Sequence, residues 1–402
     1  MANTINLTYK YRLYPNKPEI KKLEETFEIC RLVYNSMLNN RKFQYEVNKK
    51  STSCYTQIRA IASWKPEHQE LKEVHSTILQ NIAKRVNLAF EAFFRRVKNG
   101  ETPGYPRCKG KNQYKSITYT QSGFEIAKGK LSLSKIGELP IRLHRPIVGI
   151  IKTCTICKKG NKWFACFAVE QPVNYTNTSS EEVGIDVGIT KFVALSNGEF
   201  IENPRFFRKE EKNLAKAQRK FEKVKDKHGS KTRKKAKKVV SRVHERTRNR
   251  RLNFLHQTSR KVVNEFGIIY LEDLQVDNMM KSPKAKPDPD NPGQFLPNGA
   301  SAKAGLNKSI QDVSWSMFRN FLTYKAENAG GIVKAHNPAY TSQMCSECGY
   351  IDKENRPSQA VFECKNPDPE VNCKYKDHAD TNAAKNHKAI GHDSLFAATA
   401  AT

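Results

Sequence analysis

The chain has 402 residues, of which 70 are Lys or Arg and 40 are Asp or Glu, so its formal net charge is +30 at pH 7. This length predicts two or three domains and excludes a single small module, while the excess of positive charge indicates a polyanionic partner. No apolar run approaches the roughly 20 residues of a membrane span, and residues 1–16 lack the apolar core of a secretory signal, so we expect neither a membrane protein nor an exported one.

The first 175 residues are predicted to combine strands with inserted helices. Residues 5–14 alternate as a strand, and residues 18–44 and 76–97 carry apolar residues at helical spacing. From about residue 115 to 171, short alternating runs are separated by the turn signals SGF, KGK and KKGNK, which predicts an antiparallel β region. We therefore expect a β domain over residues 1–175 with a helical insertion at about residues 18–100.

A polar linker at residues 174–182 introduces a second predicted domain, residues 176–402. The segment VGIDVGITKFVALS at 183–196 predicts two apolar strands joined around Gly188, the beginning of a mixed α/β sheet. Further on, a strand is predicted at 267–271, a flexible loop with five prolines at 281–305, a helix at 315–330, a strand at 331–335 and a last helix from Thr381.

Residues 205–261 form a strongly basic segment, with 23 Lys or Arg against 5 Asp or Glu and therefore a net charge of +18. Its apolar residues predict two helices interrupted near residues 228–231. One interpretation is a solvated hairpin whose charge only maintains solubility. Phosphate contact is favoured, because solvated helices usually mix both signs of charge. The candidate phosphate-binding residues, including two from the helix at 76–97, are Lys84, Arg85, Arg219, Arg233, Lys234, Arg242 and Arg250.

Four cysteines near the C-terminus are predicted to bind a structural Zn²⁺ ion: Cys345, Cys348, Cys364 and Cys373. The first two stand two residues apart on a tight turn, which suits tetrahedral zinc. The eight residues between Cys364 and Cys373 are unusual, so His378 is an alternative fourth ligand, and four free thiols are an alternative interpretation of the motif. A second Cys-x-x-Cys, Cys154 and Cys157, lies in an alternating strand whose residues three apart face opposite sides, so it is not expected to bind metal.

Three carboxylates are predicted to meet at one edge of the second domain: Asp186 in GIDVG, Glu272 in IIYLEDL and Asp380 in HADTNAA. Hydrolysis of a phosphodiester uses two divalent ions, and hard cations bind carboxylate oxygens. Asp186 lies inside an apolar strand, where an unpaired charge is costly. Two of the three also have an ordinary interpretation: Glu272 as a strand-end carboxylate beside a competing Asp273, and Asp380 as a helix N-cap.

The ordered combination of motifs resembles TnpB, the family of transposon-encoded, RNA-guided DNA nucleases related to type V CRISPR effectors. The motifs include YRLYPN, RLVYNSML, GYPR, GIDVGITKFVALS, IIYLEDL, TSQMCSECG and DHADTNAAKN. The resemblance implies a bilobed α+β protein, with an oligonucleotide-type β-barrel wedge interrupted by a helical recognition domain, and a ribonuclease H-like RuvC domain with a zinc finger inserted at about 341–376. It also implies that Asp186, Glu272 and Asp380 bind two Mg²⁺ or Mn²⁺ ions as the catalytic acids. The separation of Cys373 from Asp380 fits the pattern of this family, so the resemblance implies Cys373 rather than His378 as a zinc ligand.

The resemblance further implies an endonuclease that uses a transposon-derived guide RNA to cut double-stranded DNA beside a short flanking motif. Most sequence choice would then come from base pairing, and four residues placed by analogy would read the flanking motif: Tyr55, Gln80, Thr120 and Gln121. We expect a monomer on the RNA, acting in the prokaryotic cytoplasm at the nucleoid. Two alternatives are a non-catalytic RNA-guided DNA-binding repressor of the same fold and an RNA-independent transposase that joins strands.

Overall fold

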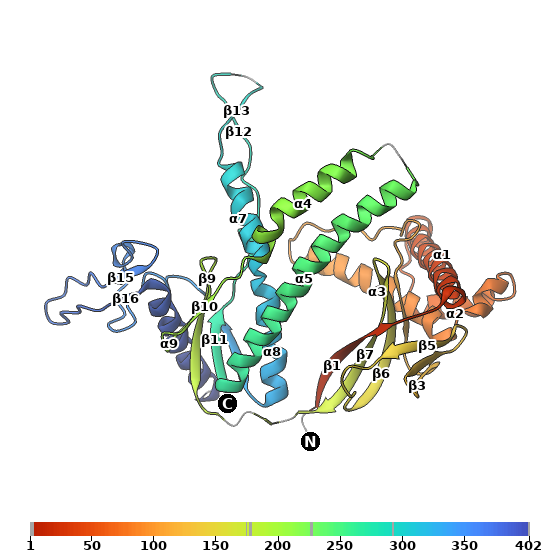
Figure 1. Cartoon of the computed structure of the whole chain (residues 1–402), viewed down its shortest axis with the longest axis horizontal. Helices are drawn as coiled ribbons and strands as arrows, with labels where there is room; N and C mark the ends of the chain where they lie inside the picture. The colour runs from red at the N-terminus through yellow and green to blue at the C-terminus, as the bar shows by residue number, and fades with distance from the viewer. Residues whose placement is uncertain (1–3, 174, 177–178, 226–227, 292, 401–402) are drawn as a thin grey trace. The chain divides into compact units, whose positions relative to one another are not determined.

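The computed structural model describes residues 4–173, 175–176, 179–225, 228–291 and 293–400, and it divides into two compact units, Met1–Pro172 and Val173–Thr402 (Figure 1). Each unit has its own hydrophobic core. Together they form a mixed α/β protein, as predicted. Among the described residues, no helix combines the length and the apolar character of a membrane span.

The first unit is built on an antiparallel seven-stranded sheet that curls into a nearly closed barrel, in the order β2-β6-β7-β1-β5-β4-β3. Its strands are β1 (Thr4–Leu13), β2 (Ser116–Tyr119), β3 (Phe124–Ala127), β4 (Lys130–Leu133), β5 (Gly137–Arg142), β6 (Ile150–Lys159) and β7 (Lys162–Pro172). Burial alternates along β7, so the side chains on one face of this strand fill the interior of the barrel. The antiparallel β region predicted from about residue 115 to 171 is therefore confirmed.

Three helices separate β1 from β2 along the chain: α1 (Lys17–Asn48), α2 (Cys54–Trp64) and α3 (Ser76–Lys98). A capping box begins α1, because the Asn16 side chain accepts from the Glu19 N–H while the Glu19 carboxylate accepts from the Asn16 N–H. The predictions of α1 and α3 are confirmed, whereas α2 was not predicted. Only Gln57 and Ile61 of α2 are buried, so this helix has no long apolar stripe to reveal it.

The second unit contains a five-stranded sheet in the order β10-β9-β8-β11-β14. Its strands are β8 (Glu182–Val187), β9 (Lys191–Leu195), β10 (Phe200–Glu202), β11 (Ile268–Glu272) and β14 (Ile332–His336). Strands β8, β11 and β14 run parallel, with β14 at one edge of the sheet, while β9 and β10 are antiparallel to their neighbours. The larger helices are α4 (Phe206–Glu222), α5 (Lys231–Glu265), α7 (Ala300–Val313), α8 (Trp315–Ala329) and α9 (Ala379–Ala400).

The segment 281–305, predicted as a flexible loop, contains regular structure. Two short strands, β12 (Lys286–Pro287) and β13 (Phe295–Leu296), pair in antiparallel fashion, and α7 begins at Ala300. Gly299 precedes α7 with a φ of +71°, a conformation that glycine adopts without steric cost. The prediction was wrong here because the prolines dominated the pattern, although they end before a helix-forming run rich in Ala and Lys.

Helix α9 lies directly against the sheet, without side chains between the two backbones at one point. A Cβ atom on Gly184 of β8 would lie 1.9 Å from the carbonyl oxygen of Ala384 of α9, and one on Gly391 would lie 2.1 Å from the ring of Tyr270. Ala383 and Ala384 are completely buried at this contact. The small residues on both sides therefore fix the height and the register of α9 over β8 and β11.

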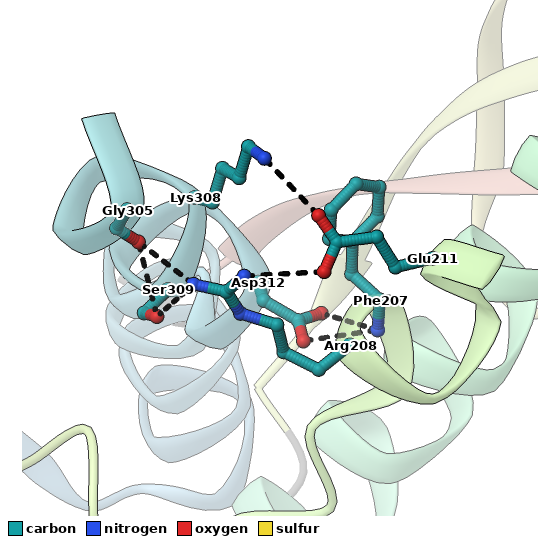
Figure 2. Close-up of polar contacts among 7 residues, drawn as sticks. All are labelled: Phe207, Arg208, Glu211, Gly305, Lys308, Ser309 and Asp312. Atoms are coloured by element: carbon teal, nitrogen blue, oxygen red, sulfur yellow. Dashed lines mark hydrogen bonds and ion pairs between the residues drawn. The ribbon is translucent and has the colours of Figure 1, made fainter. Parts of the chain in front are cut away.

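Helices α4 and α5 lie side by side and project from the sheet as a hairpin (Figure 1). Figure 2 shows how α7 holds the first turn of α4. The buried Asp312 carboxylate accepts from the Phe207 N–H at 3.0 and 2.9 Å, and Arg208 donates to the Gly305 carbonyl at 2.9 Å and to Glu211 at 3.1 Å. Asp312 thus caps a helix whose own N-cap side chain makes no capping bond.

Replacing Gly184 with alanine is expected to lower the free energy of unfolding by about 1–3 kcal/mol or more, because the new methyl group meets backbone rather than a flexible side chain. The matched control is Gly305→Ala in α7, where a Cβ would meet nothing within 4 Å and should be neutral or stabilising by up to about 1 kcal/mol. Urea unfolding followed by circular dichroism measures both. Equal effects of the two substitutions would contradict the direct contact of α9 with β8.

Candidate metal centre and nucleic-acid interface

Asp186 and Glu272 lie at the carboxyl ends of the neighbouring parallel strands β8 and β11. The register pairs Leu271 with Ile185, the residues that precede them, so both side chains reach the same edge of the sheet. A carboxylate oxygen of each lies within 4.8 Å of the other. Burial, with the Asp186 charge as the second cause, raises the pKa of Glu272 to about 8. Two acids so placed favour a shared proton or a cation.

Asp380 lies in the first turn of α9, and it is not part of the group of Asp186, Glu272 and His387, whose ligand atoms all lie within 4.8 Å of one another. Its carboxylate accepts from Arg356 at 3.1 Å. Burial and then the Asp186 charge raise the pKa of Asp380, while Arg356 opposes both. Asp380 is therefore close enough to Asp186 for the two charges to interact. One oxygen of its carboxylate is bound by the Arg356 guanidinium.

His387 joins Asp186 and Glu272 in the same group of potential ligands and was not predicted from the sequence. It is fully buried on α9, seven residues after Asp380, and two helical turns place the two residues on one face. Its Nδ1 lies 2.8 Å from Nε2 of His336. Burial and the neighbouring His387 lower the pKa of His336 to about 4. The signal that could have revealed His387 is this spacing of Asp380 and His387.

A cleft of about 330 Å³ opens beside Glu272, lined also by Trp315, Arg319 and Asn320 of α8. Arg319 forms an ion pair with Asp273. The two adjacent acids therefore face different partners: Glu272 faces Asp186, and Asp273 binds a cation from α8. This arrangement resolves the competition between Glu272 and Asp273 in favour of Glu272 as the residue that shares the site with Asp186.

The four predicted cysteines converge, and their Sγ atoms all lie within 4.8 Å of one another. The Cys345–Cys373 and Cys348–Cys364 sulfur distances are 3.8 and 3.6 Å, close to the separation of about 3.8 Å that a tetrahedron with Zn–S bonds of about 2.3 Å requires. His378 lies instead on β16 (Lys376–His378), where its ring accepts from the Asp380 N–H at 3.2 Å. The structure therefore places Cys373, rather than His378, in the candidate zinc site.

Two buried asparagines of α9 hold the first pair of cysteines. Asn382 accepts from the Ser346 N–H at 2.9 Å and donates to the Met344 carbonyl at 2.8 Å. Asn386 donates to the carbonyls of Met344 and Thr341 at 2.7 and 2.8 Å. The candidate zinc site is therefore attached to the helix that carries Asp380 and His387.

The basic segment forms the α4–α5 hairpin, and the interruption predicted near residues 228–231 agrees with the start of α5 at Lys231. Arg219, Lys234 and Arg242 are exposed. Two other candidates take part in the hairpin itself: Arg250 pairs with the buried Glu210 at 3.1 Å, and Arg233 donates to the Val224 carbonyl at 3.1 Å. Arg250 is exposed as well, but its guanidinium is paired, so Arg219, Lys234 and Arg242 are the candidates that we expect to contact phosphate.

The candidates in the first unit divide in the same way. Tyr55 on α2, Gln80 and Lys84 on α3, and Gln121 after β2 are exposed, and Thr120 is half-buried. Arg85 differs, because it donates to the Ser116 carbonyl at 2.7 Å, to Thr118 at 2.8 Å and to Asn81 at 2.9 Å. Its guanidinium joins α3 to β2, so the assignment of Arg85 to phosphate contact is corrected to a structural role.

Three family models match parts of the chain. The model described as "Probable transposase" (OrfB_IS605) matches residues 165–283, the Cas12f1-like TNB domain matches residues 315–387, and a "Helix-turn-helix domain" of the OrfB_IS605 group matches residues 1–50. Over residues 4–48 the structure contains one strand and one long helix.

Two relatives align with nearly the whole chain. The "Putative RNA-guided DNA endonuclease InsQ" of Escherichia coli (strain K12) is 32% identical over 96% of this chain and 92% of its own length. The "Putative RNA-guided DNA endonuclease" of Streptomyces pristinaespiralis is 32% identical over 97% of this chain and 90% of its own length.

A solved structure described as a "Cryo-EM structure of the Cas12f1-sgRNA-target DNA complex" has a similar fold, with a TM-score of 0.57 and 14% identity over 96% of this chain and 99% of that chain. The fold is thus that of the compact Cas12f1 class of protein. The relatives that span the chain identify the family: this chain belongs to the TnpB family.

The candidate zinc site predicts about one zinc ion for each purified full-length chain. Cys373→Ser should lower this content severalfold, because a tetrahedral structural site needs all four ligands. Cys157→Ser, in the other Cys-x-x-Cys, is the matched control and should keep the wild-type zinc content. Inductively coupled plasma mass spectrometry measures the metal, and wild-type protein without zinc would refute the assignment.

Proposed function

We propose that this protein is an RNA-guided, metal-dependent DNA endonuclease that cuts double-stranded DNA beside a short flanking motif, with a transposon-derived RNA as guide. The observation that carries the proposal is the juxtaposition of Asp186 and Glu272 at one sheet edge, with Asp380 nearby. The names of the two relatives that span the chain support the same class of reaction. The second unit would be the RuvC-like nuclease domain, and the first would be the wedge with its helical recognition insertion.

The residues present fit divalent cations. Carboxylate oxygens suit Mg²⁺ and Mn²⁺, and burial together with the Asp186 charge raises the pKa of Glu272 to about 8, which a bound cation would reverse. Asp186, Glu272 and Asp380 would hold the ions. When bound, two such ions supply a water-derived nucleophile and stabilise the leaving oxygen.

The chain's own residues bind and orient the DNA strand in this proposal. Arg319 and Asn320 line the cleft beside Glu272 and can donate to phosphate oxygens. Arg356 holds the Asp380 carboxylate at 3.1 Å and so fixes its direction. The exposed cations of the α4–α5 hairpin would neutralise the backbone of guide RNA or DNA, and base pairing would supply the sequence choice.

Asp186→Ala is expected to reduce DNA cleavage by about a hundredfold or more, because it removes a ligand from the ions that stabilise the reaction. The assay uses the full-length chain with the RNA that copurifies with it and a plasmid that carries the matching target. Asp277→Asn on α6 (Val276–Met279), an exposed acid five residues beyond Glu272, is the control and should cut normally. Target binding should survive both changes. Undiminished cutting by Asp186→Ala would refute the site, and wild-type binding without cutting would favour the repressor.

The double variant Lys234→Gln/Arg242→Gln should weaken binding of a labelled single-stranded RNA and make it less sensitive to salt. Loss of two phosphate contacts should reduce the slope of log K against log salt concentration by about 1.4. Lys261→Gln on the same helix is the control, because Lys261 pairs with Glu199 at 3.0 Å. Fluorescence anisotropy at several salt concentrations gives the slopes, and an unchanged slope in the double variant would exclude the hairpin as a phosphate-binding surface.

A further inference from the structure

We propose that His387 is a nitrogen ligand, through Nε2, of a divalent cation held by Asp186 and Glu272. The proposal deepens the proposed function and rests on its assignment of a cation to these two acids. It adds a residue type that differs chemically from the three carboxylates, and it makes a prediction about which metals this centre prefers.

The first argument is the unsatisfied nitrogen. His387 is completely buried, and its Nε2 has no hydrogen-bond partner among the described residues. This atom lies 3.7 Å from Oδ1 of Asp186, and a ring nitrogen of His387 lies within 4.8 Å of a Glu272 oxygen. A buried polar atom without a partner costs free energy. A cation bound between these three groups would give each of them a partner.

The second argument is the rigid placement of the ring. Ala384, one turn before His387 on α9, has its carbonyl oxygen against Gly184 of β8, where even a methyl group would not fit. The contact therefore fixes the helix backbone that carries His387 against the sheet, and the ring is completely buried there. A ligand fixed in this way loses little conformational entropy when it binds an ion.

The third argument is the partner of the second ring nitrogen. Metal-binding histidines generally use their other nitrogen in a hydrogen bond that fixes the ring, and Nδ1 of His387 lies 2.8 Å from Nε2 of His336. His336 stands opposite Glu272 in the parallel register of β14 and β11, so the sheet places it. If Nδ1 of His387 donates to His336, Nε2 presents its lone pair to the two acids. A cation there selects this arrangement, because it repels the N–H proton of the other tautomer.

A site with two carboxylates and one imidazole should favour Mn²⁺ or Co²⁺ over Mg²⁺ more strongly than an all-carboxylate site does, because imidazole binds transition metals better than it binds Mg²⁺. We therefore expect His387→Gln to weaken Mn²⁺ binding by about tenfold or more and to change Mg²⁺ binding much less. Isothermal titration calorimetry of the full-length chain with each metal alone measures this difference.

Electron spin-echo envelope modulation of bound Mn²⁺ provides a direct test that does not depend on cleavage. The wild-type chain should show ¹⁴N modulation from imidazole, which labelling with ¹⁵N-histidine should replace with a ¹⁵N signal. His387→Gln should lose the modulation. His378→Gln, which changes the histidine beside Asp380, is the matched control and should retain it.

Bound Mn²⁺ without imidazole modulation in the wild-type chain would overturn the proposal, as would a signal that survives in His387→Gln and disappears in His378→Gln. The wild-type and His378→Gln spectra decide the question even if His387→Gln fails to fold. Failure of the proposed function has a different signature: Mn²⁺ bound with imidazole modulation, but no DNA cleavage. Asp186→Ala should lose tight Mn²⁺ binding, which checks that the ion studied is the one at this site.

Discussion

The direct contact of α9 with β8 and β11 is the constraint on which the candidate centre depends. Asp186 and Glu272 come from the sheet, whereas Asp380 and His387 come from a helix more than 100 residues further along the chain. These groups meet because Gly184 and the small residues of α9 allow the helix backbone to touch the strand. A larger side chain at this point would lift α9 and separate the helix-borne groups from the sheet-borne acids, although each element could still form.

The same contact creates an electrostatic problem that the fold leaves unsolved. Burial and the nearby Asp186 raise the pKa of Glu272 to about 8, so the protein alone does not hold both acids in their charged forms at neutral pH. Elsewhere in this unit buried acids have cations: Asp312 pairs with Arg251 at 2.9 Å, and Glu210 pairs with Arg250 at 3.1 Å. The exception lies at the sheet edge beside the cleft, where an incoming cation would compensate the charge. Strain of this kind is typical of functional sites.

Sequence patterns predicted the parts of this centre that carry a local signal. Asp186 interrupts an apolar strand and Glu272 ends one, so both were candidates from the sequence, although Asp273 competed with Glu272 until the structure paired it with Arg319. His387 was missed, because its seven-residue spacing from Asp380 is a weak signal on its own and the residue looks like one more packing residue of α9 until the partner strands are known. The assignment of Arg85 to phosphate contact was wrong for a different reason. Its charge suggested phosphate contact, but residues of the barrel supply acceptors for its guanidinium. Both outcomes depend on tertiary neighbours, which a single sequence does not contain.

The candidate zinc site tolerates the long separation of Cys364 and Cys373 because its framework uses only the first residues of that segment, Lys365 and Asn366. The buried Asn355 donates to the Gln343 and Tyr350 carbonyls at 2.8 and 3.1 Å and accepts from the Lys365 N–H at 2.7 Å, which closes the turn around the first three cysteines. From the other side, Asn382 and Asn386 bind the same turn to α9. The residues after Asn366 can therefore loop outward without moving the first three sulfur atoms. Since α9 also carries Asp380 and His387, folding of the zinc segment and alignment of the candidate centre are two consequences of one set of asparagine contacts.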